Sequence, residues 1–225
     1  MILAREPAVA VMARVPGAVP VKSRLHAALT AAGAAELYRC FLLDRLDALA
    51  AVPGIAPVVA FTPAEAGARM AALAPSGFAL VPQEGDELGE RLARLFATLL
   101  AAGHPAALAM DSDSPTLPMA YVGEAARALA ADEADVVVGP TDDGGYYLIG
   151  LREPRPALFA DVPWSTPTVF EVTVERARRG GLRVRLLPQW FDVDTAADLR
   201  RLQAEVAGAG DGLARTRAFL RTLAR

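Results

Sequence analysis

The chain has 225 residues, of which 53% are hydrophobic and 22% are charged, with a formal net charge of −3. This length suits one sizeable core, so we expect residues 1–225 to form a single domain. One cysteine and two widely spaced histidines exclude a disulfide framework and metal sites built on cysteine or histidine clusters. Any metal is therefore expected to bind oxygen atoms, which favours Mg²⁺ or Mn²⁺.

The distribution of charge and of apolar residues excludes two further classes of partner. No stretch gathers arginines with aromatic residues into a basic face, so we expect no nucleic-acid partner. The longest apolar runs, such as residues 106–110, are too short to cross a bilayer, and the first residues lack a signal-peptide pattern. We expect a cytoplasmic protein without a membrane partner.

Short apolar or β-branched runs alternate with longer helical patterns along the chain. The first half has predicted strands at 8–13, 56–61, 78–81 and 106–110, and helices at 34–51, 63–74 and 88–101. The second half has predicted strands at 135–138, 146–151 and 183–187, and helices at 119–131, 168–179, 196–207 and 213–223. This alternation is typical of βαβ units and predicts an α/β fold with a mainly parallel sheet.

Two aspartates, Asp111 and Asp113, come directly after the buried strand predicted at 106–110. In open parallel sheets, ligands bind beyond the carboxyl ends of the strands. Carboxylates two residues apart reach one side of a hard cation and leave room for the phosphate oxygens of a ligand. The alternative is a turn in which an aspartate caps the next helix. We favour the metal site.

A second acidic segment, from Asp192 to Thr195, precedes the helix predicted at 196–207. Thr195 and Asp198 have the spacing of a capping box, and this structural role does not account for Asp192 and Asp194. We expect Asp194 to supply a third carboxylate to the same cation.

Two acids and two glycines, Asp142 to Gly145, separate the strands predicted at 135–138 and 146–151. Asp-Gly is a strong hairpin signal, so a simple hairpin turn is the alternative to a functional role. Paired glycines also let a ligand approach the backbone closely. We expect this turn to contact the substrate.

A loop with three cations, Arg14, Lys22 and Arg24, follows the first predicted strand and ends at the start of a helix. Lys22 is the only lysine among 23 basic residues. Helix starts favour anions through their free N–H groups and dipole, although the loop has neither a Walker A motif nor G-x-G-x-x-G. The alternative is a solvated basic loop. We expect the loop to bind phosphate.

The segment from Ala13 to Gly17, continuing to Lys22-Ser23-Arg24-Leu25, resembles the opening of the DUF2064 family, within the nucleotide-diphospho-sugar transferase superfamily. Stretches that match in the same order lie at 83–91, 111–117, 139–151, 164–166 and 192–199. The resemblance implies a GT-A fold, a Rossmann-like, mostly parallel mixed sheet with helices on both faces.

The resemblance also implies roles for particular residues. Asp113 becomes the main metal ligand and Asp194 its partner, while Asp111 stands where the family pattern has a glycine. The basic loop and Gln83 are expected to bind the nucleotide, together with Gly144 and Gly145.

Together these features predict a metal-dependent transferase. A glycosyltransferase would use a nucleotide sugar, with Asp142 or Asp143 contacting the sugar or acting as base toward a small-molecule acceptor. The Lys22-Ser23-Arg24-Leu25 element is also similar to that of phospholactate guanylyltransferases. The alternative is therefore a nucleotidyltransferase that joins an NTP to a phosphorylated small molecule and releases pyrophosphate. A third possibility is a module that binds nucleotide sugar without turnover.

Overall fold

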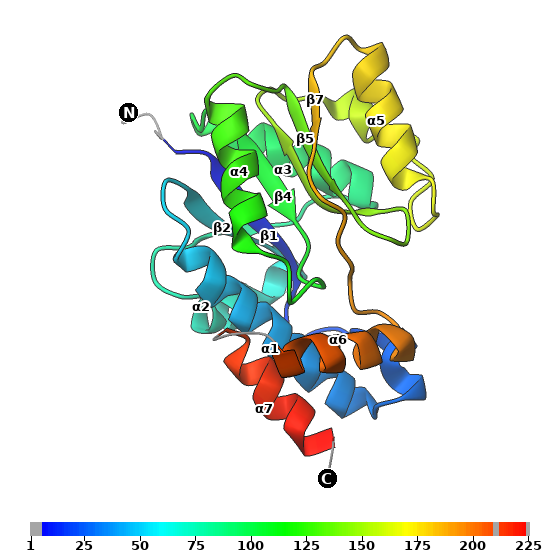
Figure 1. Cartoon of the computed structure of the whole chain (residues 1–225). Helices are drawn as coiled ribbons and strands as arrows, with labels where there is room; N and C mark the ends of the chain where they lie inside the picture. The colour runs from blue at the N-terminus through cyan, green and yellow to red at the C-terminus, as the bar shows by residue number, and fades with distance from the viewer. Residues whose placement is uncertain (1–5, 209–211, 224–225) are drawn as a thin grey trace.

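One mixed sheet organises the computed structural model, which describes residues 6–208 and 212–223 (Figure 1). Its strand order is β3-β2-β1-β4-β6-β5-β7. Strand β6 runs antiparallel to both of its neighbours, and the remaining neighbours are parallel. The strands are β1 (Ala8–Arg14), β2 (Ala56–Thr62), β3 (Ala79–Pro82), β4 (Ala107–Met110), β5 (Val136–Pro140), β6 (Tyr146–Leu151) and β7 (Val184–Leu186). The predicted α/β fold with a mostly parallel mixed sheet is confirmed.

The helices follow the predicted order with three differences. The α-helices are α1 (Ala31–Ala50), α2 (Gly67–Leu73), α3 (Leu88–Ala101), α4 (Met119–Ala130), α5 (Val169–Arg179), α6 (Ala196–Gly208) and α7 (Ala214–Leu223). Helix α1 begins earlier than predicted, because the Thr30 side chain caps it by accepting a hydrogen bond from Gly33 N at 3.1 Å. The helix predicted at 63–74 is divided into the 3₁₀ turn Ala64–Ala66 and α2.

The third difference concerns the expected phosphate site at a helix start. The basic loop leads into the short 3₁₀ turn Ser23–Ala27 rather than directly into an α-helix. Within the described ranges, no helix combines the length and the apolar character that crossing a bilayer requires.

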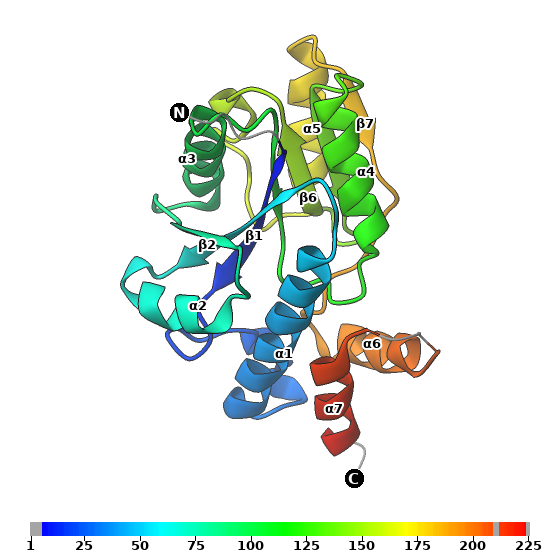
Figure 2. The same ribbon diagram turned by 90° about the vertical axis from the view of Figure 1, so that its left-hand side faces the viewer.

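Helices cover both faces of the sheet (Figure 1, Figure 2). Strand residues alternate between the two faces, so one set of side chains meets each layer of helices. Val9, Val11 and Leu108 pack with α1, α2 and α4. Ala10, Ala60 and Ile149 point the other way and pack with α3 and α5. The helices on both faces that the GT-A resemblance implies are therefore present.

A third apolar cluster lies beyond the edge of the sheet, where α6 and α7 pack beside α1 (Figure 1). The buried Asp44 of α1 accepts hydrogen bonds from Arg215 N and Thr216 N, at 3.2 and 2.9 Å. These are free N–H groups of the first turn of α7, so the carboxylate caps that helix. The cluster also holds Phe191 and Val193, which flank Asp192. The packing of α6 and α7 thus fixes the acidic segment before α6.

Candidate active site

The loops after β1 and β4 and the segment before α6 meet at one edge of the sheet. Strands β1 and β4 are parallel neighbours, so their carboxyl ends lie side by side. Val193 N donates a hydrogen bond of 2.9 Å to Asp113 O, which joins the segment before α6 to the segment after β4. Three parts of the chain that are far apart in sequence therefore meet where open α/β sheets bind ligands.

Lys22 forms the centre of this meeting point. Its Nζ lies 2.7 Å from Asp113 Oδ1 and 2.8 Å from Asp194 Oδ1, and its side chain is 3% exposed. Burial lowers the pKa of Lys22, but the charges of Asp113 and Asp194 outweigh this and leave its pKa well above the ordinary value. Arg24 adds a longer contact, 3.5 Å from Nη1 to Asp194 Oδ2. The two carboxylates thus converge on one cation.

Asp111 begins the same segment as Asp113, and its side chain is only partly exposed. Its Oδ2 accepts a hydrogen bond of 2.6 Å from Ser114 Oγ, and its backbone N donates one of 2.9 Å to Tyr147 O. The buried Oδ1 has no hydrogen-bond partner. Burial, with the charge of Asp113, raises the pKa of Asp111 to about 6. Asp111 is therefore a carboxylate with one oxygen still free to bind a cation.

Asp192 belongs to the same cluster and was not among the predicted site residues. Burial, followed by the charges of Asp143, Asp194 and Asp111, raises the pKa of Asp192 to about 7. The available signal was its spacing: Asp192 and Asp194 repeat the Asp-x-Asp pattern of the segment after β4. The site therefore contains one more acidic residue than the three predicted metal ligands.

The two predicted catalytic aspartates both lie in the turn between β5 and β6, but they have different partners. Asp143 Oδ1 accepts hydrogen bonds from Thr141 Oγ1 at 2.5 Å and Gly145 N at 3.0 Å, and its charge acts on Asp192. Asp142 is instead paired with Arg201 of α6 at 2.5 Å. Asp143 therefore faces the acidic cluster, whereas the carboxylate of Asp142 is held by α6.

The turn is a hairpin, as the alternative interpretation held, and it is closely packed. Gly144 has φ +90°, and a Cβ placed there would lie 2.0 Å from Pro167 O. Phe170 N also donates to Gly144 O at 2.9 Å. Close packing against residues 167–170 therefore accounts for the glycine at position 144, independently of any ligand.

Two further predicted nucleotide contacts lie at the ends of β1 and β3. The Gln83 Nε2 group donates to Ala60 O at 2.7 Å and to Ala13 O at 3.3 Å. Arg14 Nη1 donates to Pro20 O at 3.3 Å, within the loop that carries Lys22. Arg14 thus braces the loop that carries Lys22, and Gln83 is bound to β2 and β1, the next two strands of the sheet after β3.

A tyrosine of α1 links the loops after β1 and β4, and no sequence pattern pointed to it. Arg14 N donates to the Tyr38 hydroxyl at 2.9 Å, and Arg14 O lies 3.2 Å from it. The same hydroxyl is 3.1 Å from Ser112 Oγ. Burial raises the pKa of Tyr38 to about 12, so the hydroxyl keeps its proton. One neutral side chain thereby fixes the loop of Lys22 relative to the aspartates.

The carboxylates of Asp111, Asp113 and Asp194 are of the kind that Mg²⁺ and Mn²⁺ prefer, and the Oδ1 of Asp111 has no hydrogen-bond partner. Among the described residues, however, no three acidic, histidine or cysteine side chains are already gathered around one metal position. Lys22 supplies the positive charge in this arrangement.

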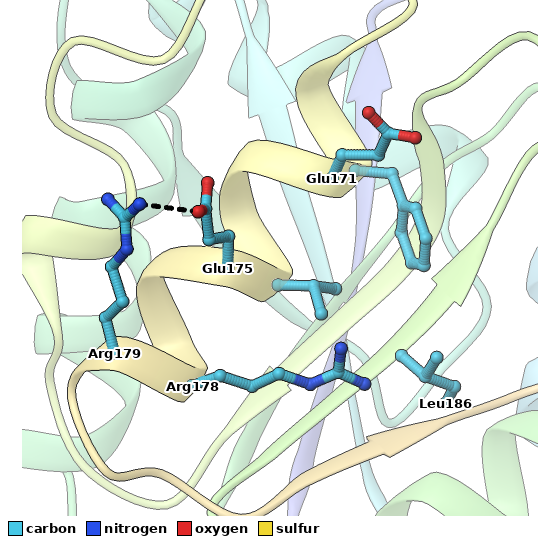
Figure 3. Close-up of a pocket in the computed structure, with 7 residues that line it drawn as sticks. Glu171, Glu175, Arg178, Arg179 and Leu186 are labelled. Carbon is cyan, nitrogen blue, oxygen red and sulfur yellow. Dashed lines mark ion pairs between the residues drawn. The ribbon is translucent and has the colours of Figure 1, made fainter.

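The surface hollow beside α5 has a different character. It has a volume of about 350 Å³ and lies on the outer side of the helix, where Glu175 pairs with Arg179 at 2.6 Å (Figure 3). Its lining includes Phe170, Val174 and the exposed Leu186, and no residue of the acidic cluster. The candidate site therefore remains the acidic cluster at the ends of β1 and β4, which this hollow does not include.

A family model described as an uncharacterised protein conserved in bacteria (DUF2064) matches residues 45–166. The chain belongs to the DUF2064 family. A protein of Desulfovibrio desulfuricans G20, provisionally named a nucleotide-diphospho-sugar transferase, is 31% identical; the match covers 96% of this chain and 94% of that one, with a TM-score of 0.88. No curated protein matches the sequence.

More distant solved structures share the fold alone. CMP:2-keto-3-deoxy-manno-octonic acid synthetase complexed with CTP is 14% identical over 90% of this chain and 98% of its own, with a TM-score of 0.59. The 4-diphosphocytidyl-2C-methyl-D-erythritol synthase of Anaerococcus prevotii is 11% identical over 90% and 97%, with a TM-score of 0.60. The nucleotide-diphospho-sugar transferase fold implied by the sequence is confirmed.

Proposed function

We propose that the protein is a metal-dependent transferase that uses a nucleotide-linked substrate, and that this substrate is a nucleotide sugar. The observation that carries the proposal is the convergence of Asp113 and Asp194 on one cation at the ends of β1 and β4. This is the position where folds of this kind bind phosphorylated ligands. The relative from Desulfovibrio desulfuricans, by its name, supports the same class of donor.

Asp113, Asp194 and Asp111 would hold Mg²⁺ or Mn²⁺. The raised pKa values of Asp111 and Asp192 reflect burial first and the charges of neighbouring carboxylates second, and a divalent cation would offset that repulsion. Bound there, the ion would neutralise charge on the diphosphate as the leaving group departs. Lys22, Arg14 and Arg24 would hold the phosphates, since all three cations lie at the end of β1 or in the loop after it.

Asp143 is the better of the two predicted catalytic residues. It faces the acidic cluster, and only one of its oxygens is occupied by hydrogen bonds within the turn. We therefore assign to Asp143 the contact with the sugar or with the acceptor hydroxyl, whose proton it would accept. Asp142, which pairs with Arg201, would contribute only by holding the turn in position.

Nucleotidyl transfer is the second candidate. It is favoured by Lys22, whose Nζ lies directly at the carboxylates in an element similar to that of phospholactate guanylyltransferases. Such an enzyme would join an NTP to a phosphorylated acceptor and release pyrophosphate. Both candidates use the same carboxylates and cations, so products must distinguish them.

The test incubates the protein and Mn²⁺ with UDP- and GDP-sugars in one series, and with NTPs and phosphorylated acceptors in another. Release of a nucleoside diphosphate from a nucleotide sugar is the expected result. Release of pyrophosphate would favour the second candidate over the first. Asp113→Asn should abolish either activity, whereas Glu175→Gln, on the outer side of α5, should leave it unchanged. Nucleotide binding without any product would contradict both candidates.

A further inference from the structure

Helix α1 carries an arginine that lies wholly inside the protein. Arg45 is 2% exposed, and its neighbours along α1, Leu42, Leu46 and Leu49, belong to the buried apolar cluster on this face of the sheet. Its Nη1 donates to Leu117 O at 3.2 Å, but its Nε and Nη2 have no hydrogen-bond partner. A buried guanidinium is costly unless an opposite charge compensates it. The residue therefore needs an explanation beyond packing.

The opposite charge is Asp111. Burial lowers the pKa of Arg45 to about 10, and the charge of Asp111 acts against that change, so the guanidinium stays protonated at neutral pH. In return, the charge of Arg45 counters the rise in the pKa of Asp111. The two groups form no direct ion pair in the described structure, but each is the counter-charge of the other. Arg45 and the Oδ1 atom of Asp111 are buried, so solvent screens their attraction little.

Arg45 also holds the segment that follows Asp111. Its bond to Leu117 O ties α1 to the far end of residues 111–117, while its charge acts at the near end. Tyr38, two helical turns earlier on α1, contacts Ser112 in the middle of the same segment. Helix α1 thus contacts the segment at two points, and the charge of Arg45 also acts on Asp111.

We propose that Arg45 is a positioning residue, the internal counter-ion of Asp111 that holds residues 111–117 so that Asp113 faces Lys22 and Asp194. The proposal stands on the hydrogen bond from Arg45 to Leu117 O and on the buried Arg45 Nε and Nη2 and Asp111 Oδ1, none of which has a hydrogen-bond partner. Its consequence for metal affinity rests on the proposed function.

The first arm of the test is a double-mutant cycle on thermal unfolding with Arg45→Met and Asp111→Asn. Arg45→Met should lower the Tm by roughly 10 °C, because it leaves a buried carboxylate without its counter-charge. Adding Asp111→Asn should restore roughly 4 °C of that loss. If Arg45 acts only through packing, the two losses will add, and the proposal fails. Arg39→Met, on the surface of the same helix, is the control and should change the Tm by less than about 2 °C.

The second arm measures Mn²⁺ affinity at a temperature where every variant is folded. Arg45→Met should weaken Mn²⁺ binding by about 10-fold or more, and Arg45→Lys should recover part of it, because partners behind metal ligands typically contribute 10- to 100-fold. Mn²⁺ affinity unchanged in Arg45→Met would overturn the positioning role. If the wild type binds no Mn²⁺ but the cycle shows coupling, the proposed metal chemistry fails and the counter-ion role stands.

Should Arg45→Met not fold, Arg45→Lys and Arg45→Gln replace it in the first arm. The counter-ion role predicts that the lysine variant melts above the glutamine variant, since lysine retains the charge. Equal melting temperatures, or a higher one for glutamine, would contradict the proposal.

Discussion

At the scale of single residues, Lys22 is the residue on which the site depends. It is the only lysine in the chain, and its ammonium lies within 2.8 Å of two carboxylates that we propose as metal ligands. A metal and this ammonium therefore compete for the same oxygens until phosphates arrive to bind Lys22. Removing this ammonium should therefore strengthen the binding of free metal and weaken the binding of nucleotide.

We predict that Lys22→Met binds Mn²⁺ about 10-fold more tightly than the wild type when nucleotide is absent, because a competing cation has been removed. Binding of a nucleotide with Mn²⁺ should weaken by a similar factor, since the phosphates lose an ammonium contact. Calorimetric titrations with and without nucleotide measure both. Arg24→Met, which removes only a contact of 3.5 Å, should change the free-metal affinity less. Weaker Mn²⁺ binding by Lys22→Met alone would contradict the competition.

Asp192 gives the stability of the protein a specific pH dependence. Its pKa is about 7 in the folded protein against an ordinary value of 3.8, so the folded state binds the extra proton between those values. Stability must then fall as the pH rises from about 4 to about 7. Because the side chain is partly exposed, we expect the metal-free protein to lose about 2 kcal/mol from this group, less than the full shift implies.

The measurement is urea unfolding of the wild type and Asp192→Asn at pH values from 5 to 8 without divalent metal. The variant should be the more stable protein at pH 8, and the difference should shrink toward pH 5. Asp111 contributes in the same direction and remains in both proteins, so the difference isolates Asp192. A constant difference across the range would contradict the raised pKa.

At the scale of secondary-structure elements, α1 connects the two halves of the site through Tyr38. Tyr38→Phe removes the hydroxyl that contacts Arg14 N, Arg14 O and Ser112 Oγ. We expect a loss of about 1–3 kcal/mol in unfolding free energy and weaker nucleotide binding, because the loops after β1 and β4 are no longer joined. Tyr121→Phe removes a hydroxyl from a residue whose ring packs edge-on against Trp190, and should leave nucleotide affinity unchanged. Equal affinities for both variants would refute the bridging role.

The turn between β5 and β6 depends on Gly144 for space as well as for backbone conformation. Gly144→Ala brings a Cβ to within 2.0 Å of Pro167 O, so we expect a loss of roughly 3 kcal/mol or more in unfolding free energy. Gly77 has nearly the same φ, +91°, and a Cβ added there would meet no atom within 4 Å, so Gly77→Ala should cost only about 1–2 kcal/mol. Chemical denaturation of both variants separates the clash from the backbone strain. Equal losses would show that packing against residues 167–170 is unimportant.

The sequence predicted elements better than it predicted contacts. Residues 146–151 and 88–101 form a strand and a helix at the predicted bounds, because apolar periodicity depends on local sequence. Thr195 and Asp198 form the predicted capping box through bonds of 2.7 and 3.3 Å. The sequence did contain a signal for Arg45, because it is a charged residue within the apolar stripe of α1, four residues after Phe41. No sequence signal indicated that the ammonium of Lys22 lies between two carboxylates, since this contact joins positions 172 residues apart.

At the scale of the whole molecule, the fold brings opposite charges to one edge of the sheet. Cations come from the loop after β1, and acids come from the segments after β4 and before α6. The third apolar cluster, formed by α1, α6 and α7, holds the last of these segments in place. The family and the fold are established by the comparisons, while the reaction rests on this arrangement of charges.

The most direct test of the central claim is calorimetric titration of nucleotides and nucleotide sugars into the protein with Mn²⁺ and with a chelator. We predict binding that depends on Mn²⁺ and that weakens at least about 10-fold in Asp113→Asn and in Asp194→Asn, with Glu175→Gln equal to the wild type. Nucleotide binding of equal strength with the chelator, or in both aspartate variants, would contradict the proposed site.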